Sequence, residues 1–98
     1  RSSAADGIPL STANQRASGW IAVHQYVGAP YEAYFQGVEQ IMNDYAGRPH
    51  WGKLHFQSRH TLAHRYPEWD TFISWRDKLD PSGTFRNAYL DRVLGPPA

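Results

Sequence analysis

The sequence predicts an α+β fold that forms one part of a larger assembly. Residues 20–27 are rich in β-branched and aromatic types, which is typical of a strand, while residues 30–46 and 67–79 repeat apolar side chains at helical spacing. One strand cannot satisfy its edge hydrogen bonds, and two helices of this length cannot cover both of its apolar faces. We therefore expect the missing strands to come from polypeptide outside these 98 residues.

Composition narrows the functional classes. The net charge is +1 and the basic residues are scattered, so no basic stripe can follow a phosphate backbone and nucleic acid is not an expected partner. The absence of cysteine excludes disulfides, thiolate zinc sites and cysteine nucleophiles within this sequence. No apolar run approaches the ~20 residues that span a bilayer. Four Trp, six Tyr and four Phe indicate a chain that packs into a folded structure. The composition does not determine the cellular compartment.

The first elements follow from residue type. Residues 1–19 are rich in Ser, Ala and Gly without an apolar period, which predicts a flexible segment. In residues 20–27, alternate side chains face opposite sides of the expected strand. Pro30 suits the first turn of a helix, and Gly47 is a natural left-handed stop, so the helix should end just before it. The apolar stripe of this helix consists of Tyr31, Tyr34, Phe35, Val38, Ile41, Met42 and Tyr45.

The C-terminal half predicts two further helical segments. Residues 58–64 favour a short helical turn, and Pro67 can start a full helix. The sequence Asp-Pro-Ser-Gly at residues 80–83 ends that helix by turn chemistry. Residues 84–98 have spaced apolar anchors without a firm period, so we expect a tail that lies across a surface.

Most of the polar residues have an ordinary explanation. His60 and His64 would share a helix face as zinc ligands do, but no third ligand stands at a suitable spacing, so no metal site is predicted. The acidic residues of the second helix alternate with basic ones and fit a solvated surface. No serine elbow, phosphate loop or dinucleotide-binding glycine pattern is present. If the protein is an enzyme, another segment holds the phosphates of its cofactor.

The loop at residues 47–55, GRPHWGKLH, is unusually rich in aromatic and basic residues for a joint between two helices. The proline after Arg48 pushes that residue out of the helical region, and Gly52 permits a close backbone approach. We therefore expect a rigid loop that presents Lys53. On residue chemistry alone, a solvated Lys53 and a Trp51 packed in the core remain open explanations.

Four segments together resemble one family of enzymes. They are RPHWGKLH at 48–55, RYPEWDTF at 65–72, RDKLDPSGTF at 76–85 and NAYLDRVLG at 87–95. They resemble the C-terminal end of the aldonolactone oxidases, the sugar-lactone and alditol branch of the vanillyl-alcohol-oxidase-type flavoenzymes. The similarity covers residues 20–95, and its centre is the His-Trp-x-Lys (HWxK) element in a Gly-Arg-Pro setting.

The resemblance implies that this chain is the end of a longer enzyme. Family members have an FAD-binding domain, a cap domain built on an antiparallel sheet, and a C-terminal return to the flavin. Residues 1–19 would then be a flexible segment, residues 20–46 the end of the substrate or cap domain, and residues 47–98 the HWxK loop with a segment packed on the FAD domain. We expect a larger FAD-binding chain as the partner, arising from a nicked precursor or as a separate subunit.

The resemblance also implies roles for the loop. The HWxK lysine of the family lies at the flavin and the substrate, so Lys53 is the expected catalytic residue and a cofactor contact. Its ammonium would stabilise the negative charge that develops on the reduced ring. His50 is expected to contact the substrate or the flavin, and Trp51 to shape the cofactor pocket.

Three further residues take expected roles from the resemblance. His24 lies in the expected cap-sheet strand and is a candidate contact to a sugar hydroxyl. Asn87 and Tyr89 match the terminal Asn-x-Tyr element of the family, which implies a place over the cofactor. For all three, a purely structural role is the open alternative.

The expected function is oxidation of a CH–OH group in a sugar lactone, alditol or similar polyol by hydride transfer to FAD. One alternative is a flavin oxidase of the same family that acts on a different alcohol. A noncatalytic structural subunit of a flavoprotein complex is a second alternative, and a free-standing binding module is a third. No membrane span and no metal are expected.

Overall fold

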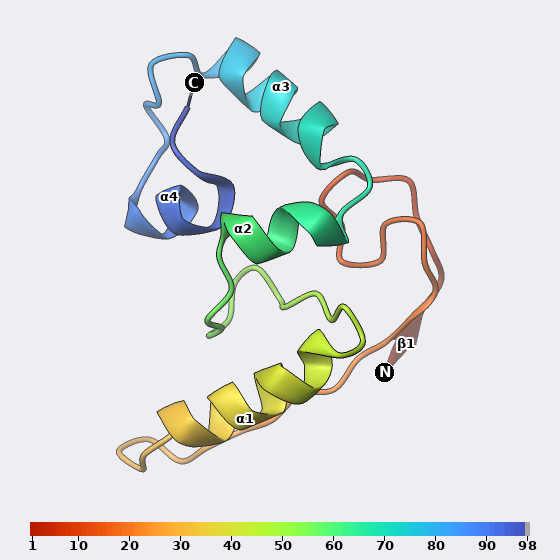
Figure 1. The fold of residues 1–98 in the computed structure, drawn as a ribbon, viewed down its shortest axis with the longest axis vertical. Coiled ribbons are helices and arrows are strands. Elements are labelled where there is room, and N and C mark those ends of the chain that lie inside the picture. Colours follow the sequence, from red (N-terminus) through yellow and green to blue (C-terminus); the bar gives the residue numbers. More distant parts are fainter. Residues whose placement is uncertain (98) are drawn as a thin grey trace.

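The computed structural model describes residues 1–97 as a small α+β arrangement (Figure 1). Two short strands, β1 (Ser2–Ser3) and β2 (Ser18–Gly19), pair antiparallel with Ser2 opposite Gly19. The helices are α1 (Glu32–Asn43), α2 (Arg59–Leu62), the 3₁₀ turn η1 (Ala63–Arg65), α3 (Trp69–Leu79) and α4 (Ala88–Leu94). The α+β class is thereby confirmed, although its strands are not where the sequence predicts one.

The prediction of a strand over residues 20–27 is wrong for the chain as described. Within residues 1–97 these positions carry no strand pairing, and the segment runs as a loop that leads into α1 (Figure 1). Tyr26 and Val27 are fully or almost fully exposed, at 88% and 107%, and Ile21 is 75% exposed. The amide of Trp20 still donates to the carbonyl of Arg1 at 2.8 Å, but partners that would extend a strand to residue 27 are not among the described residues.

The helix predicted over residues 30–46 is confirmed as α1, with a different stop. Ala46, at φ 51°, is the left-handed residue, whereas the sequence pointed to Gly47. The amide of Gly47 donates to the carbonyl of Met42 at 2.9 Å, and the amide of Ala46 to that of Asn43 at 3.1 Å, which is the Schellman pattern. Gly47 is still needed, because a Cβ there would lie 3.0 Å from the backbone oxygen of Met42.

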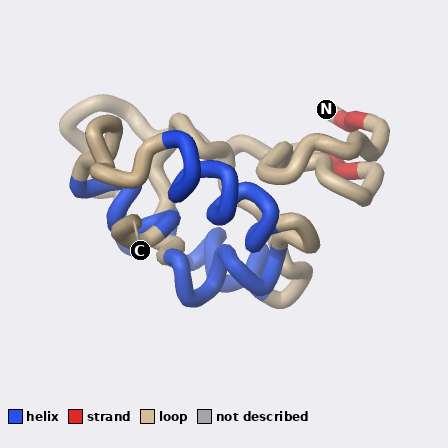
Figure 2. Tube along the Cα trace, turned by 90° about the horizontal axis from the view of Figure 1, so that it is seen from above, coloured by secondary structure: helices blue, strands red, loops and turns tan. Residues whose placement is uncertain are grey.

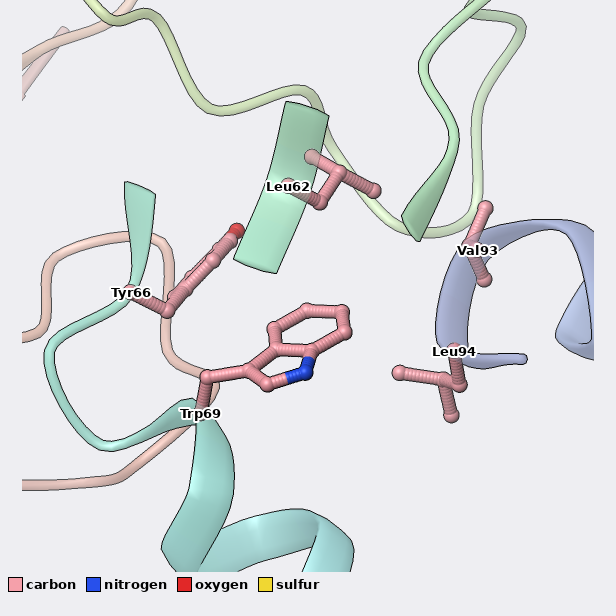
Figure 3. Close-up of a cluster of buried hydrophobic side chains, with 5 residues drawn as sticks. All are labelled: Leu62, Tyr66, Trp69, Val93 and Leu94. Atoms are coloured by element: carbon pink, nitrogen blue, oxygen red, sulfur yellow. The ribbon is translucent and has the colours of Figure 1, made fainter. Parts of the chain in front are cut away.

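The core lies between the last three helices (Figure 3). It consists of the buried side chains Leu62, Tyr66, Trp69, Val93 and Leu94. The helical turn predicted at residues 58–64 is confirmed by α2 and η1, and the helix predicted after Pro67 is confirmed by α3. By contrast, α1 buries none of its residues and lies apart from this core (Figure 1).

The prediction of a tail across a surface after residue 83 is wrong, because α4 forms there and supplies part of the core. The side-chain oxygen of Asn87 accepts a hydrogen bond from the amide of Leu90 at 2.9 Å, which caps the first turn of α4. Gly95, at φ 79°, follows its last turn. Seven residues are too short a span for a helical period to be visible in the sequence.

The N-terminal segment is mostly loop, and several hydrogen bonds tie it to the rest of the molecule. Figure 2 shows β1 and β2 at the edge of the molecule, away from the helices. Asn14 is fully buried, and its amide donates to a carboxylate oxygen of Glu68 at 2.7 Å. Within residues 1–19, which were expected to be flexible, Asn14 is therefore held in place by this contact.

The described residues are more open than an independent domain of the same length. The radius of gyration is 14.7 Å, and the extents are 41 × 32 × 20 Å. A compact domain of this length has a radius of gyration of about 13 Å. None of the helices described for residues 1–97 has both the length and the apolar character needed to cross a membrane.

Candidate functional site

The candidate site is a broad groove of about 1350 Å³ beside the loop at residues 47–55. We call this loop the HWGK loop. One wall is the segment before α1, the second is the C-terminal half of α1, and the third is the HWGK loop itself. The predicted site residues that line the groove are His24, His50, Trp51, Lys53 and Tyr89. Asn87 does not line it, since its side chain caps α4.

Two arginines fix the start of the HWGK loop. The Nε of Arg48 donates to the carbonyl of Arg65 at 2.8 Å, and its Nη1 donates to the carbonyl of Asn14 at 2.8 Å. The Nη1 of Arg65 donates in return to the carbonyl of Gly47 at 2.6 Å. Burial lowers the pKa of both guanidinium groups, yet arginine stays charged at any ordinary pH. The loop is therefore held rigidly at its entry.

Trp51 anchors the middle of the loop to the core. Its indole Nε1 donates to the carbonyl of Leu10 at 2.9 Å, and its ring stacks on Tyr66 with centroids 5.5 Å apart. The guanidinium of Arg48 lies 4.6 Å from the centroid of the same tyrosine ring. Burial raises the pKa of Tyr66 to about 12, so the ring is a neutral packing surface at physiological pH. Trp51 thus packs on the core while also lining the groove.

Lys53 lies at the end of a tight turn and is exposed. Its backbone amide donates to the carbonyl of His50 at 3.1 Å, and the amide of Gly52 donates to the Nδ1 of His50 at 3.0 Å. In the neutral imidazole this leaves the proton on Nε2, which is the donor that His50 can offer to the groove. Within residues 1–97, no carboxylate lies within ion-pair distance of the Lys53 ammonium.

Of the remaining predicted residues, His24 is open to a ligand, whereas Tyr89 and Asn87 make contacts within the fold. His24 is exposed on the segment before α1 and lines the groove. Tyr89 is half-buried, and its hydroxyl donates to the carbonyl of Trp51 at 2.6 Å. Tyr89 therefore acts on the loop itself, whereas Asn87 serves the helix that carries Tyr89.

Sequence reasoning missed His55, Arg48 and Arg65 as parts of the site. His55 is buried, and its Nε2 lies 2.9 Å from the Tyr89 hydroxyl. These residues stand in the quoted motifs, but their roles depend on contacts between segments far apart in the sequence. No local spacing rule could have paired residue 55 with residue 89.

The groove can supply cations, imidazole groups and an aromatic wall to a bound molecule, since Arg16 and His24 line it together with Lys53, His50 and Trp51. Such a set suits a planar aromatic group on which negative charge develops, or a ligand rich in hydroxyl groups. Among the residues that the structure describes, no group of three or more His, Asp or Glu side chains could hold a metal ion. His60 and His64 are both exposed.

Comparison with known proteins gives the family. The model of the D-arabinono-1,4-lactone oxidase family matches residues 1–93, a range that also includes the N-terminal segment outside the four motifs. The chain is 58% identical over 96 residues to L-gulono-1,4-lactone dehydrogenase of Mycobacterium tuberculosis, which covers 98% of this chain and 22% of that protein.

Two further relatives extend the comparison. L-gulonolactone oxidase of Bos taurus is 39% identical over 93 residues, covering 91% of this chain and 21% of that protein. Alditol oxidase of a Streptomyces species is 39% identical over 57 residues, covering 58% of this chain and 14% of that protein. The chain thus spans about a fifth of the length of its two more similar relatives. It belongs to the D-arabinono-1,4-lactone oxidase family and corresponds to the C-terminal region of these oxidoreductases.

Proposed function

We propose that this chain is the C-terminal part of an FAD-dependent oxidoreductase that oxidises a CH–OH group of a sugar lactone, alditol or similar polyol. The observation that carries the proposal is Lys53, exposed on a rigid loop at the edge of a large groove, in a chain of this family. The names of the relatives support the substrate class, because they include a gulonolactone dehydrogenase, a gulonolactone oxidase and an alditol oxidase.

The residues of the groove fit a flavin ring. The ammonium of Lys53 has no carboxylate partner within residues 1–97, so its charge is available to a ligand. When bound, FAD supplies the acceptor for the hydride that leaves the substrate carbon. Lys53 would stabilise the negative charge that develops beside it, and Trp51 would form part of the wall of the ring pocket.

The same groove suits a substrate with several hydroxyl groups. His50 can donate from Nε2, since its Nδ1 already accepts from the amide of Gly52. His24 also lines the groove, from the segment before α1. We assign both histidines to hydrogen bonds with substrate hydroxyls, and His50 also to the cofactor side.

The rest of the site must come from polypeptide beyond these residues. The sequence has no glycine-rich phosphate loop, and the matched region is only 22% of the Mycobacterium tuberculosis relative. Several exposed apolar side chains line the same groove. Exposed apolar residues that gather in one place indicate an interface, whereas scattered single ones do not. This set is Ile21, Tyr45, Leu54 and Phe56. We assign the FAD-binding portion to the part of the relatives that this chain does not match.

The experiment is substitution of Lys53 in the full-length protein, followed by anaerobic stopped-flow measurement of flavin reduction by an aldonolactone or alditol. Lys53→Ala should slow reduction by ~10²–10³, the scale for loss of one preorganised electrostatic donor. The matched control is Lys78→Ala. Lys78 is exposed on α3, lies 4.8 Å from the ring centroid of Trp75, and does not line the groove. The control should reduce flavin at the wild-type rate.

A normal rate in Lys53→Ala would refute the catalytic assignment and favour a structural role for this chain in a flavoprotein. That outcome has a specific basis in the structure, because Trp51 and Asn87 are both engaged in packing or capping. A different result in the wild-type protein would favour the other alternative. If lactones and alditols do not reduce its flavin but another alcohol does, the chain belongs to a flavin oxidase of the same family with a different substrate.

A further inference from the structure

A chain of hydrogen bonds joins α4 to the HWGK loop through two side chains. The hydroxyl of Tyr89, on α4, donates to the carbonyl of Trp51 at 2.6 Å. The Nε2 of His55 lies 2.9 Å from the same hydroxyl. The carbonyl of Trp51 belongs to the turn that ends at Lys53. The two side chains therefore hold the backbone of the loop at Trp51, two residues before Lys53.

The direction of each hydrogen bond can be assigned. The Nδ1 of His55 accepts from the amide of Gln57 at 3.1 Å, so in the neutral ring the proton is on Nε2. Nε2–H then donates to the Tyr89 oxygen, and the Tyr89 O–H donates onward to Trp51. Both nitrogens of the imidazole and the tyrosine hydroxyl are used. Neither side chain therefore has a hydrogen-bond donor left for a ligand.

Burial, together with the positive charge of Arg92, keeps His55 neutral. Burial lowers the pKa of His55, Arg92 on α4 lowers it further, and Glu39 on α1 raises it. Arg92 also donates to the carbonyl of His55 at 3.2 Å, and its guanidinium lies 5.4 Å from the ring centroid of Tyr89. Burial likewise raises the pKa of the Tyr89 hydroxyl, which keeps its proton. The donor and acceptor pattern is therefore fixed at neutral pH.

We propose that His55 and Tyr89 are positioning residues that clamp the HWGK loop and so hold Lys53 toward the groove. Tyr89 was expected to contact the cofactor directly, whereas the geometry assigns its hydroxyl to the loop backbone. The effect on the reaction rests on the proposed function, because it acts through Lys53. The effect on the loop itself does not.

The test uses the full-length holoprotein and the variant Tyr89→Phe, with two readouts. Hydrogen exchange measured by mass spectrometry should be roughly ten-fold faster in peptides covering residues 50–57 and unchanged in peptides covering α3. Flavin reduction should be roughly ten-fold slower, with the effect in kcat and little change in KM, because a displaced catalytic group costs rate. The matched control is Tyr34→Phe, since the Tyr34 hydroxyl is exposed and makes no hydrogen bond within residues 1–97.

A second pair of variants keeps the proposal testable if Tyr89→Phe fails to fold. His55→Gln retains an N–H donor for Tyr89, whereas His55→Leu does not. The clamp predicts that His55→Gln stays closer to wild type than His55→Leu in both readouts. Wild-type exchange at residues 50–57 in Tyr89→Phe, or in His55→Leu, would overturn the proposal.

The two proposals fail in different ways. Faster exchange of the loop in Tyr89→Phe, together with a wild-type reduction rate in Lys53→Ala, would leave the clamp standing and refute the catalytic role of Lys53. Slow reduction in Lys53→Ala with unchanged loop exchange and rate in Tyr89→Phe would do the reverse.

Discussion

Replacing Ala46 by glycine should stabilise the protein, although glycine usually destabilises. Ala46 is held at φ 51° in the Schellman motif that ends α1, and an L-residue in the left-handed region costs about 1–2 kcal/mol. Glycine removes that strain but adds conformational freedom to the unfolded chain, which costs roughly 0.4–1 kcal/mol. The Ala46 side chain is exposed, so little packing is lost. The difference is a net gain of roughly 0–1.6 kcal/mol, with a central value of about 0.8 kcal/mol.

The matched control is the same chemical change inside α1. Ala33 is exposed and helical, so Ala33→Gly should destabilise by about 1 kcal/mol. Urea denaturation of the full-length protein, followed by far-UV circular dichroism, would give the two changes in midpoint. Opposite shifts support the Schellman geometry. A lower midpoint for Ala46→Gly would refute it.

Two further predictions concern the core and the turn after α3. Leu62 is fully buried, so Leu62→Ala should destabilise by about 2–5 kcal/mol, measurable as a lower urea midpoint, whereas an unchanged midpoint would contradict the core assignment. Hydrogen bonds from the amides of Phe85 and Thr84 lower the pKa of Asp80 below 3.8. The stabilisation that the Asp80 carboxylate contributes is therefore present above pH 3.8 and is lost as the pH falls through the lowered pKa. The melting temperature of Asp80→Asn, measured against pH, should therefore fall less steeply at acid pH than that of the wild type, and an equal fall would contradict this role.

The sequence predicted helices well where their apolar period was long. α1 and α3 have 12 and 11 residues, enough for a stripe to be visible, and both were found. α4 has seven residues and was missed. Its stabilisation comes from Val93 and Leu94 in the core and from the cap at Asn87, which are tertiary and local contacts rather than a period.

The error over residues 20–27 has a different cause. Alternation of β-forming residues reports what the side chains favour, but a strand also needs a neighbouring strand for its backbone. That neighbour is not among the residues described, and the exposed Tyr26 and Val27 show the consequence. The inference that the partner strands lie outside this sequence stays a prediction.

The candidate site was predictable in part. The HWGK loop and its lysine stand out in the sequence because histidine, tryptophan and lysine are unusual in a short joint between helices. What holds the loop could not be predicted, since Arg48, Arg65, His55 and Tyr89 act through contacts across 17 to 38 positions of the chain. Those contacts join segments far apart in the sequence, so they exist only in the folded chain.

The most direct measurement is a crystal structure of the full-length protein with FAD and a substrate analogue bound. The account predicts that the ammonium of Lys53 faces the isoalloxazine ring, with the carbonyl of Trp51 still bonded to Tyr89. An ammonium that points into bulk water, with the ring bound elsewhere, would contradict the central claim.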